Sequence, residues 1–258
     1  MYRLAVAVVF LFCALCALGQ TRPTSDQLAI TLAQQSISAL TDGTAINDTT
    51  LNANVTSILG ADHESGSATL RAKGINESRI DLSLNTSGVR SDVRNVLTSG
   101  PAGAWSTNGG PATAYTNHNC WVDAVWFFPE LSSLSQTANP NFVFKYIGLT
   151  QHGAVNAQHI QIFQWSSQDA TIPHLSTMDF YLDPVSSLPL AIDFKVHSDS
   201  DMNVDIPVEI GFANYQRVSG VQVPFHIQRM LNGGVVLDAT LTSATLNGGL
   251  ADTLFSLH

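Results

Sequence analysis

Charged residues are scarce in this sequence. Asp, Glu, Lys and Arg make up 12% of its 258 residues, and only 11 of those residues are basic. Hydrophobic residues reach 45%, so the chain can bury a substantial core, and the shortage of charge does not indicate disorder. The bases are outnumbered by 20 acids, so the sequence lacks the basic stripe that phosphate binding needs. Nucleic acid is therefore excluded as a partner.

Cysteine is scarce too, and two of the three cysteines lie in one apolar run near the N-terminus. Arg3 precedes this run, which extends over residues 4–18 and ends at Gly19 and Gln20. A basic start, about 15 apolar residues and small residues at the end are typical of a signal peptide. The run is short for a membrane span, which needs roughly 20 apolar residues. We expect residues 1–19 to be a signal peptide, with an uncleaved anchor as the alternative.

Removal of such a leader would leave Cys120 as the single cysteine of residues 20–258. No internal disulfide could then form. Secreted eukaryotic domains of this size usually carry disulfides, so their lack favours a bacterial export product. We find no linker long enough to separate two domains, and we expect one periplasmic or secreted domain over 20–258.

The sequence also lacks the motifs of common hydrolases. There is no Gly-x-Ser-x-Gly segment, and His63-Glu64 lacks the second histidine of a zinc-protease motif. Cys120 stands two residues after His118, but a thiol and its base usually meet through the fold rather than through sequence proximity. We interpret Cys120 as a buried cysteine and predict no catalytic residues.

One acidic segment has the alternation of a calcium-binding loop. Asp199, Asp201, Asn203 and Asp205 alternate with other residues, but Val204 replaces the glycine of the sharp turn. Ile210 stands where a bidentate glutamate is required. The pattern favours a solvated hairpin tip over a weak calcium site, so we predict no metal and no cofactor.

Strict alternation of apolar and polar residues is the clearest positive feature, and it runs from Tyr181 to Asn247. It recurs in three segments, 190–197, 206–213 and 221–228. Side chains of a strand alternate between two faces, so these segments predict antiparallel strands with one apolar face.

Other elements precede this meander. Cap-like residues, apolar spacing and Gly43 predict a helix over 25–41. Strands are predicted over 51–59, 67–73, 79–85 and 89–97, then from Phe142 to Tyr146 and over 158–165. The Gly-rich stretch 98–111, which holds Trp105, and the polar stretch 166–176 read as loops. We expect ten or eleven strands in all.

The most aromatic segment extends from Cys120 to Phe128. Trp121, Val125 and Phe128 fall at helical spacing, and Pro129 limits the continuation. Leu131 and Leu134 could extend it as a second helical piece. This segment is either ordinary core or a lid over a hydrophobic cavity.

Three segments together resemble the bacterial periplasmic lipoprotein-carrier family, the outer-membrane lipoprotein localisation factors and their relatives. Residues 181–190 are similar to a family strand that ends in Asp, followed by a turn and Leu-Pro. Residues 219–225 are similar to its turn-Gly-Val-x-x-Pro segment, and residues 245–255 to its final strand. The resemblance implies a mainly β (α+β) fold, in which short helices cover a strongly curved antiparallel sheet, an incomplete β-barrel. It also implies an apolar cavity that receives acyl chains.

We therefore expect an exported, non-enzymatic, monomeric protein that binds a lipid or another hydrophobic molecule, with a membrane or a lipoprotein as a further partner class. The alternatives are a structural or adhesive β protein with a self-filled core, and a secreted hydrolase built on His118, Cys120 and Asp123. The candidate ligand-binding residues comprise the lid, the mouth of the cavity and its wall: Trp121, Val125 and Phe128; Trp105; and Phe142, Phe144, Ile192, Phe194, Ile210, Phe212, Phe225 and Ile227.

Overall fold

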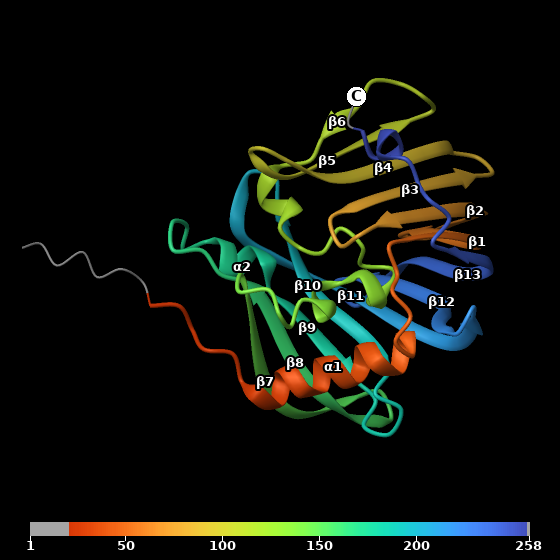
Figure 1. Cartoon of the computed structure of the whole chain (residues 1–258). Helices are drawn as coiled ribbons and strands as arrows, with labels where there is room; N and C mark the ends of the chain where they lie inside the picture. Colours follow the sequence, from red (N-terminus) through yellow and green to blue (C-terminus); the bar gives the residue numbers. More distant parts are fainter. Residues whose placement is uncertain (1–20, 257–258) are drawn as a thin grey trace, which may run out of the picture.

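The computed structural model describes residues 21–256, and they form a single 13-stranded antiparallel sheet (Figure 1). The expected signal peptide lies outside the described residues. None of the described helices is long and apolar enough to cross a membrane. The strands are β1 Asp48–Leu59, β2 Asp62–Lys73, β3 Glu77–Leu84, β4 Gly88–Leu97, β5 Gly100–Thr107, β6 Thr113–Ala114, β7 Phe142–His152, β8 Val155–Gln164, β9 Met178–Leu182, β10 Pro189–Ser198, β11 Asp201–Val218, β12 Val221–Leu231 and β13 Gly234–Leu246. The helices are α1 Gln27–Thr41, α2 Ile172–Ser176 and the 3-10 turns η1 Asn117–Cys120, η2 Pro129–Leu131, η3 Ser133–Ser135 and η4 Asp252–Phe255.

Two meanders make up the sheet, and they meet at its centre. The strand order is β6-β5-β4-β3-β2-β1-β13-β12-β11-β10-β9-β8-β7, so the pairing of β1 with β13 joins the first strand to the last. The Asp48 carboxylate, at the start of β1, accepts hydrogen bonds from the backbone N–H of Gly248 (2.7 Å) and Gly249 (3.0 Å). The start of the first strand is thus tied to the turn that follows the last strand.

Apolar residues line up across the strands on one face of the sheet. Leu51 lies opposite Leu70, which lies opposite Ile80, and in the other half Ile192 lies opposite Ile210. This face carries the core, as the alternation predicted. The predicted fold class, a curved and incomplete antiparallel barrel with few helices, is confirmed. The strand count of ten or eleven was too low because the Gly-rich stretch 98–111 contains β5 and the start of β6 lies just after it.

Helix α1 covers part of the core and contacts β7, β8, β12, η2 and η3 (Figure 1). Its buried residues Ala29, Ala33, Ser36 and Leu40 recur at the spacing of one helix face. The helix ends where Asp42 takes a left-handed conformation, φ 49°, and donates to the Ser38 carbonyl. Leu28, although apolar, lies on the exposed side of the helix.

The segment before α1 lies along β7, the strand at one end of the sheet. Asp26 donates its backbone N–H to the Phe144 carbonyl (2.8 Å), and its carboxylate accepts from the Tyr146 N–H (3.1 Å). The Ser25 hydroxyl accepts from the Phe144 N–H (3.1 Å), and Arg22 donates to the Phe142 carbonyl (2.9 Å). These bonds satisfy the outward backbone groups of β7 as far as Tyr146.

The segment between β6 and β7, residues 115–141, is the insertion, and it fills the apolar side of the curved sheet (Figure 1). The predicted helix over Trp121–Phe128 is wrong, because residues 121–128 form turns between η1 and η2. Short-range bonds such as Leu131 N–H to Phe128 O (3.0 Å) satisfy its backbone. The helical spacing arose because the segment is buried on several sides, so apolar residues occur at nearly every position.

The polar stretch 166–176 also differs from the expected loop. Its last part is the short helix α2, whose Ile172 and Leu175 are buried. Helix α2 contacts β8 and β10 and leads directly into β9.

Candidate functional site

The predicted wall residues share one apolar face, as the alternation required. Ile192 and Ile210 are opposite one another, as are Phe212 and Ile227. Seven of the eight are buried, and Phe225 packs against them while partly exposed. The core cluster that they join includes the insertion, so the wall contacts protein side chains. Its members among the predicted residues are Phe142, Phe144, Ile192, Phe194, Ile210, Phe212 and Ile227. Their role in ligand binding stays a prediction.

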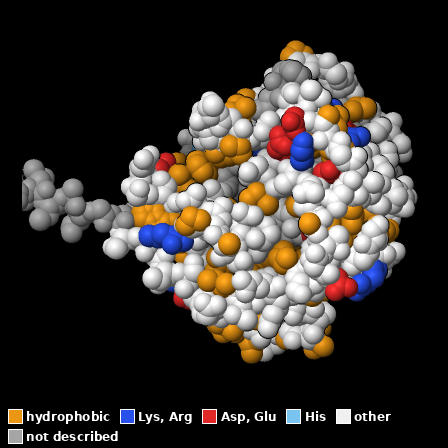
Figure 2. All heavy atoms as spheres, viewed as in Figure 1, with side chains coloured by type: hydrophobic (Ala, Val, Ile, Leu, Met, Phe, Trp, Pro, Cys, Tyr) orange, Lys and Arg blue, Asp and Glu red, His pale blue; other side chains and the backbone are white. Residues whose placement is uncertain are grey.

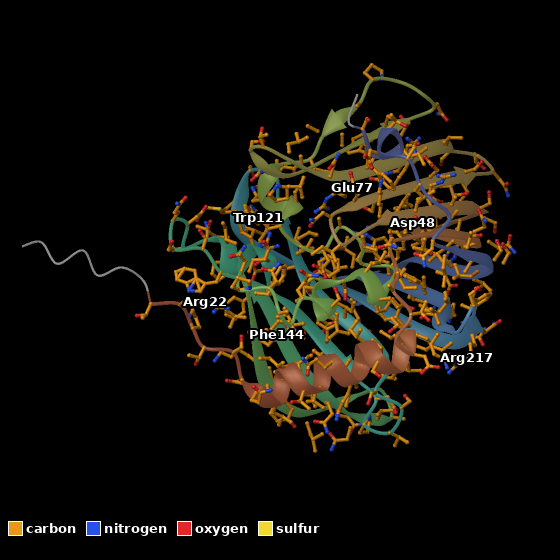
Figure 3. All side chains as sticks on the ribbon, in the orientation of Figure 1. Arg22, Asp48, Glu77, Trp121, Phe144 and Arg217 are labelled. Carbon is orange, nitrogen blue, oxygen red and sulfur yellow. The ribbon has the colours of Figure 1, made fainter. Side chains whose placement is uncertain are left out.

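The predicted lid residues separate into two environments. Val125 and Phe128 are fully buried and pack into the core beside Phe127 and Leu134, which are also fully buried. Trp121, in the first part of the insertion, is partly exposed. It lies apart from Phe144, which is next to α1 (Figure 3). The insertion therefore fills the concave side of the sheet, with one aromatic residue at its rim.

Trp105, predicted near the mouth, lies on β5 opposite Asp92. The Arg90 guanidinium stands 4.6 Å from the centre of its ring, and Arg90 in turn donates to the Asp92 carboxylate (2.9 Å). The indole is thus held by a cation–π contact on the strand.

A cleft of about 310 Å³ opens beside Trp121, between the insertion and the ends of β3, β4 and β5. Figure 2 shows it as a hollow in the face that carries α1. Trp121 and Phe142 are the predicted site residues that line it. Its volume lies at the lower end of the range of small-molecule sites. The full lining is Ile75, Asn76, Arg94, Asn95, Val96, Gly100, Pro101, Cys120, Trp121, Val122, Ala124, Asn139, Asn141, Phe142 and Gln164.

Two guanidinium groups at this side of the core have no carboxylate partner within residues 21–256. Arg94 is the charged residue of the cleft lining, and it donates to the Val122 carbonyl of the insertion (3.4 Å). Arg229, on β12, stands 5.3 Å from the centre of the Trp126 ring, and its buried Nε has no hydrogen-bond partner among the described residues. A buried cation without a partner is costly, so this arrangement favours an anionic group.

The insertion also carries two carboxylic acids into the core. Asp123 accepts from the backbone N–H of Ser133 (2.7 Å), and burial raises its pKa to about 6. Neither carboxylate oxygen of Glu130 has a hydrogen-bond partner among the described residues, and burial raises its pKa well above the usual value. Burial, with the Glu130 charge as a second cause, also raises the pKa of Tyr215. Sequence reasoning missed Glu130, although an acid inside an apolar segment was a visible signal.

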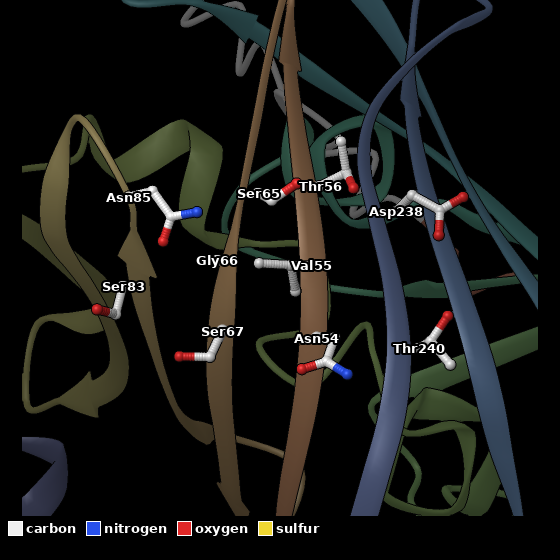
Figure 4. A pocket seen from close by; sticks show the side chains of 10 residues that line it. All are labelled: Asn54, Val55, Thr56, Ser65, Gly66, Ser67, Ser83, Asn85, Asp238 and Thr240. Carbon is white, nitrogen blue, oxygen red and sulfur yellow. The ribbon is translucent and has the colours of Figure 1, made fainter.

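A larger hollow of about 540 Å³ lies on the other face of the sheet, across β1, β2, β3 and β13 (Figure 4). Its lining is almost entirely polar, with Asn54, Ser67 and Thr240 as examples. It is a shallow groove of side-chain hydroxyls and amides, so it does not suit an apolar ligand. The cleft beside Trp121 fits that chemistry better despite its smaller volume.

The residues proposed for a hydrolase do not meet. His118 bonds through Nε2 to the Ser198 carbonyl (3.0 Å), whereas Asp123 is bound to Ser133. The Cys120 thiol donates to the Thr116 carbonyl (3.7 Å), and burial raises its pKa. A raised pKa disfavours the thiolate, the reactive form.

Solved structures of three bacterial proteins are similar to this fold. A scan against protein-family models and a search of the curated proteins gave no match. A domain assigned to outer membrane lipoprotein sorting in Vibrio parahaemolyticus aligns with a TM-score of 0.58 at 10% identity, covering 89% of this chain and 96% of that chain. A DUF1329 family protein from Desulfovibrio piger gives 0.58 at 9% identity, covering 91% and 98%. A LolA superfamily protein from Nitrosomonas europaea gives 0.56 at 10% identity, covering 88% and 97%. At these identities the likeness shows the fold alone, and it confirms the carrier-like fold that the sequence motifs predicted.

Proposed function

We propose that this chain is an exported, non-enzymatic, monomeric carrier that binds an acyl chain with an acidic headgroup. The acyl chain would lie between the concave face of the sheet and the insertion, and the headgroup would lie in the cleft beside Trp121. The observation that carries the proposal is Glu130, a carboxylic acid that belongs to the segment covering the apolar face and is buried without a hydrogen-bond partner among the described residues.

Glu130 makes the closed insertion less stable than an apolar cover would be. An unpaired buried carboxyl group costs several kcal/mol or must stay protonated. Movement of the insertion away from the sheet would return Glu130 to water but would expose Phe127 and Phe128, which are fully buried. An acyl chain could replace these contacts, since each buried methylene contributes about 0.8 kcal/mol. Such a segment is suited to exchange places with a ligand.

The guanidinium groups of Arg94 and Arg229 support the acidic headgroup. Arg94 lines the cleft, and Arg229 lies at the core side against Trp126. A charge-assisted hydrogen bond to a carboxylate or phosphate contributes about 1.5–3 kcal/mol. We therefore expect fatty acids to bind more tightly than the alcohols of equal chain length.

Titration of tryptophan fluorescence with a fatty acid and with the matching fatty alcohol tests this proposal. Arg94→Gln should weaken fatty-acid binding by about tenfold or more, and it should leave alcohol binding nearly unchanged. Arg217→Gln, at an exposed arginine that pairs with Asp42, is the matched control and should bind both like the wild type. Absence of any fluorescence change with either amphiphile, together with no lipid in native mass spectra of detergent-free protein, would refute the carrier function.

The alternative, a structural or adhesive protein with a self-filled core, is favoured by the complete burial of Val125, Phe127, Phe128 and Leu134. Hydrogen exchange distinguishes the two functions. A carrier should exchange its amides over residues 121–135 much faster than the strands β10–β12, and ligand should slow that exchange. A structural core should protect all of these segments alike. A membrane or lipoprotein that receives the ligand stays a prediction.

A further inference from the structure

Two histidines and an aspartate from three separate elements meet just beyond the N-terminal end of β9. His197 on β10 and Asp205 on β11 are directly opposite one another in the sheet. Strand β9 begins at Met178, which pairs with Phe194, so β9 does not reach the level of His197. Helix α2, which precedes β9, occupies this level and brings His174 to the pair. We name these three residues the His-His-Asp cluster.

The spacing of the nitrogen and oxygen atoms in the cluster is that of ligands around a metal ion. Oδ1 of Asp205 lies 3.2 Å from Nε2 of His174 and 3.3 Å from Nε2 of His197. The potential ligand atoms of the three residues all lie within 4.8 Å of one another. Zinc bonds nitrogen and oxygen at about 2.0–2.1 Å, so two ligands of a tetrahedral site are about 3.3–3.4 Å apart. Two of the three separations therefore already match that value.

His197 provides an independent indication of a ligand. Its side chain is 1% exposed, yet neither ring nitrogen makes a hydrogen bond among the described residues, although Nε2 faces the Asp205 carboxylate at 3.3 Å. Buried polar atoms almost always form hydrogen bonds, so a buried imidazole without one needs an explanation.

The surroundings also suit a bound cation. Lys195 bonds to the other carboxylate oxygen of Asp205, Oδ2, and carboxylates that bind metals are commonly held by such a second contact. His174 is 44% exposed, so an ion could enter without opening of the fold. His174 and Lys195 also border a groove of about 410 Å³.

We propose that His174, His197 and Asp205 bind one Zn²⁺ ion or a similar late transition-metal ion, with water as the fourth ligand. Two imidazoles and one carboxylate are a common zinc ligand set, whereas Ca²⁺ and Mg²⁺ require mainly oxygen ligands. The ion would tie α2 to β10 and β11. Its binding does not depend on the proposed carrier function. The calcium loop considered for residues 199–205 shares Asp205 with the cluster, but its Asp201 accepts from the backbone N–H of Asn203 (2.9 Å) and is not one of the three ligands.

Metal titration of the full chain, prepared free of metal with a chelator, tests the proposal. Calorimetry should show one Zn²⁺ per chain and no comparable binding of Mg²⁺ or Ca²⁺. Co²⁺ should give the visible absorption of a tetrahedral complex. His174→Ala and Asp205→Asn should each weaken Zn²⁺ binding at least tenfold. His174 is 44% exposed, so its replacement should leave the fold intact. Circular dichroism checks that the variant is folded.

His226→Ala is the matched control, since His226 lies 3.1 Å from Asp238 and this pair has no third potential metal ligand among the described residues. It should bind Zn²⁺ like the wild type. The proposal is overturned if His174→Ala binds Zn²⁺ as tightly as the wild type, because binding would then be adventitious. It is also overturned if the wild type binds no stoichiometric Zn²⁺, or if His226→Ala loses as much affinity as His174→Ala.

Discussion

Replacement of Glu130 by glutamine should remove a large pH dependence from the stability of this protein. Glu130 is 4% exposed, and its two carboxylate oxygens are without hydrogen-bond partners among residues 21–256. Burial raises its pKa well above the usual value. Gln has nearly the shape of the protonated acid but cannot ionise, so the variant isolates the ionisation of this one group.

The sign follows from proton linkage. A carboxyl group whose pKa is raised in the folded state contributes most favourably below its unfolded pKa, 4.5 for glutamate. That contribution is lost as the pH rises from 4.5 to the raised value, at about 1.4 kcal/mol per pH unit. The stability of Glu130→Gln relative to the wild type should therefore increase with pH at this rate over that range.

Urea unfolding at half-unit steps from pH 4 to pH 8 measures the difference, and all other titrating groups cancel between the two proteins. Asp62→Asn, at the exposed first residue of β2, is the control and should show a pH profile parallel to that of the wild type. A stability difference between Glu130→Gln and the wild type that stays constant from pH 4 to pH 8 would refute the reasoning. It would mean that Glu130 is solvated in the folded protein.

Three further predictions concern single positions. Burial raises the pKa of Asp123 to about 6, so the same linkage applies to it over a lower pH range. In urea unfolding, the stability of Asp123→Asn relative to the wild type should increase by about 3 kcal/mol between pH 3.5 and pH 7. A difference that stays constant with pH would contradict the burial argument. Asp48→Ala should lower the free energy of unfolding by about 2–3 kcal/mol, because two N–H groups at the β1–β13 joint lose a charged acceptor. The control is Asp252→Ala, at an exposed pair with Lys73. It should change the free energy of unfolding by less than about 0.5 kcal/mol. Gly66→Ala should lower the free energy of unfolding by about 1–3 kcal/mol, measured by thermal unfolding, since a Cβ there would lie 2.1 Å from the Ser83 carbonyl oxygen. Gly211→Ala should be tolerated, because a Cβ there has its nearest contact at 3.9 Å. Equal effects at the two glycines would argue against the close approach at Gly66.

The closing meander could be predicted from the sequence because its signal is local. Apolar residues alternate with polar ones over each strand, so the faces of Ile192, Phe194, Ile210 and Phe212 followed without knowledge of the fold. Strand β5 could not be predicted in the same way. Its Gly103 reads as a turn residue, but a Cβ at that position would lie 2.6 Å from the Arg94 side chain. Glycine marks a close approach here rather than a turn.

The candidate sites depended on contacts between distant parts of the chain. Trp121, Val125 and Phe128 have the spacing of a helix, yet their segment is shaped by burial between α1 and the sheet, which no local pattern reveals. The pairing of His197 with Asp205 follows from the register of one hairpin and could have been predicted. The approach of His174 could not, because it depends on where α2 ends and β9 begins.

The segment that lies along β7 determines how an open sheet can remain a separate molecule. An uncovered edge strand is a template on which another chain can add a strand, and long apolar edges lead to polymers. Residues Arg22, Ser25 and Asp26 occupy the edge of β7 from Phe142 to Tyr146. The stretch left beyond them, residues 147–152, holds the exposed Ile147 and Leu149 but is short. At the opposite end, β6 is two residues long. With both edges reduced in this way, the sheet can stay open without offering a long template to another strand.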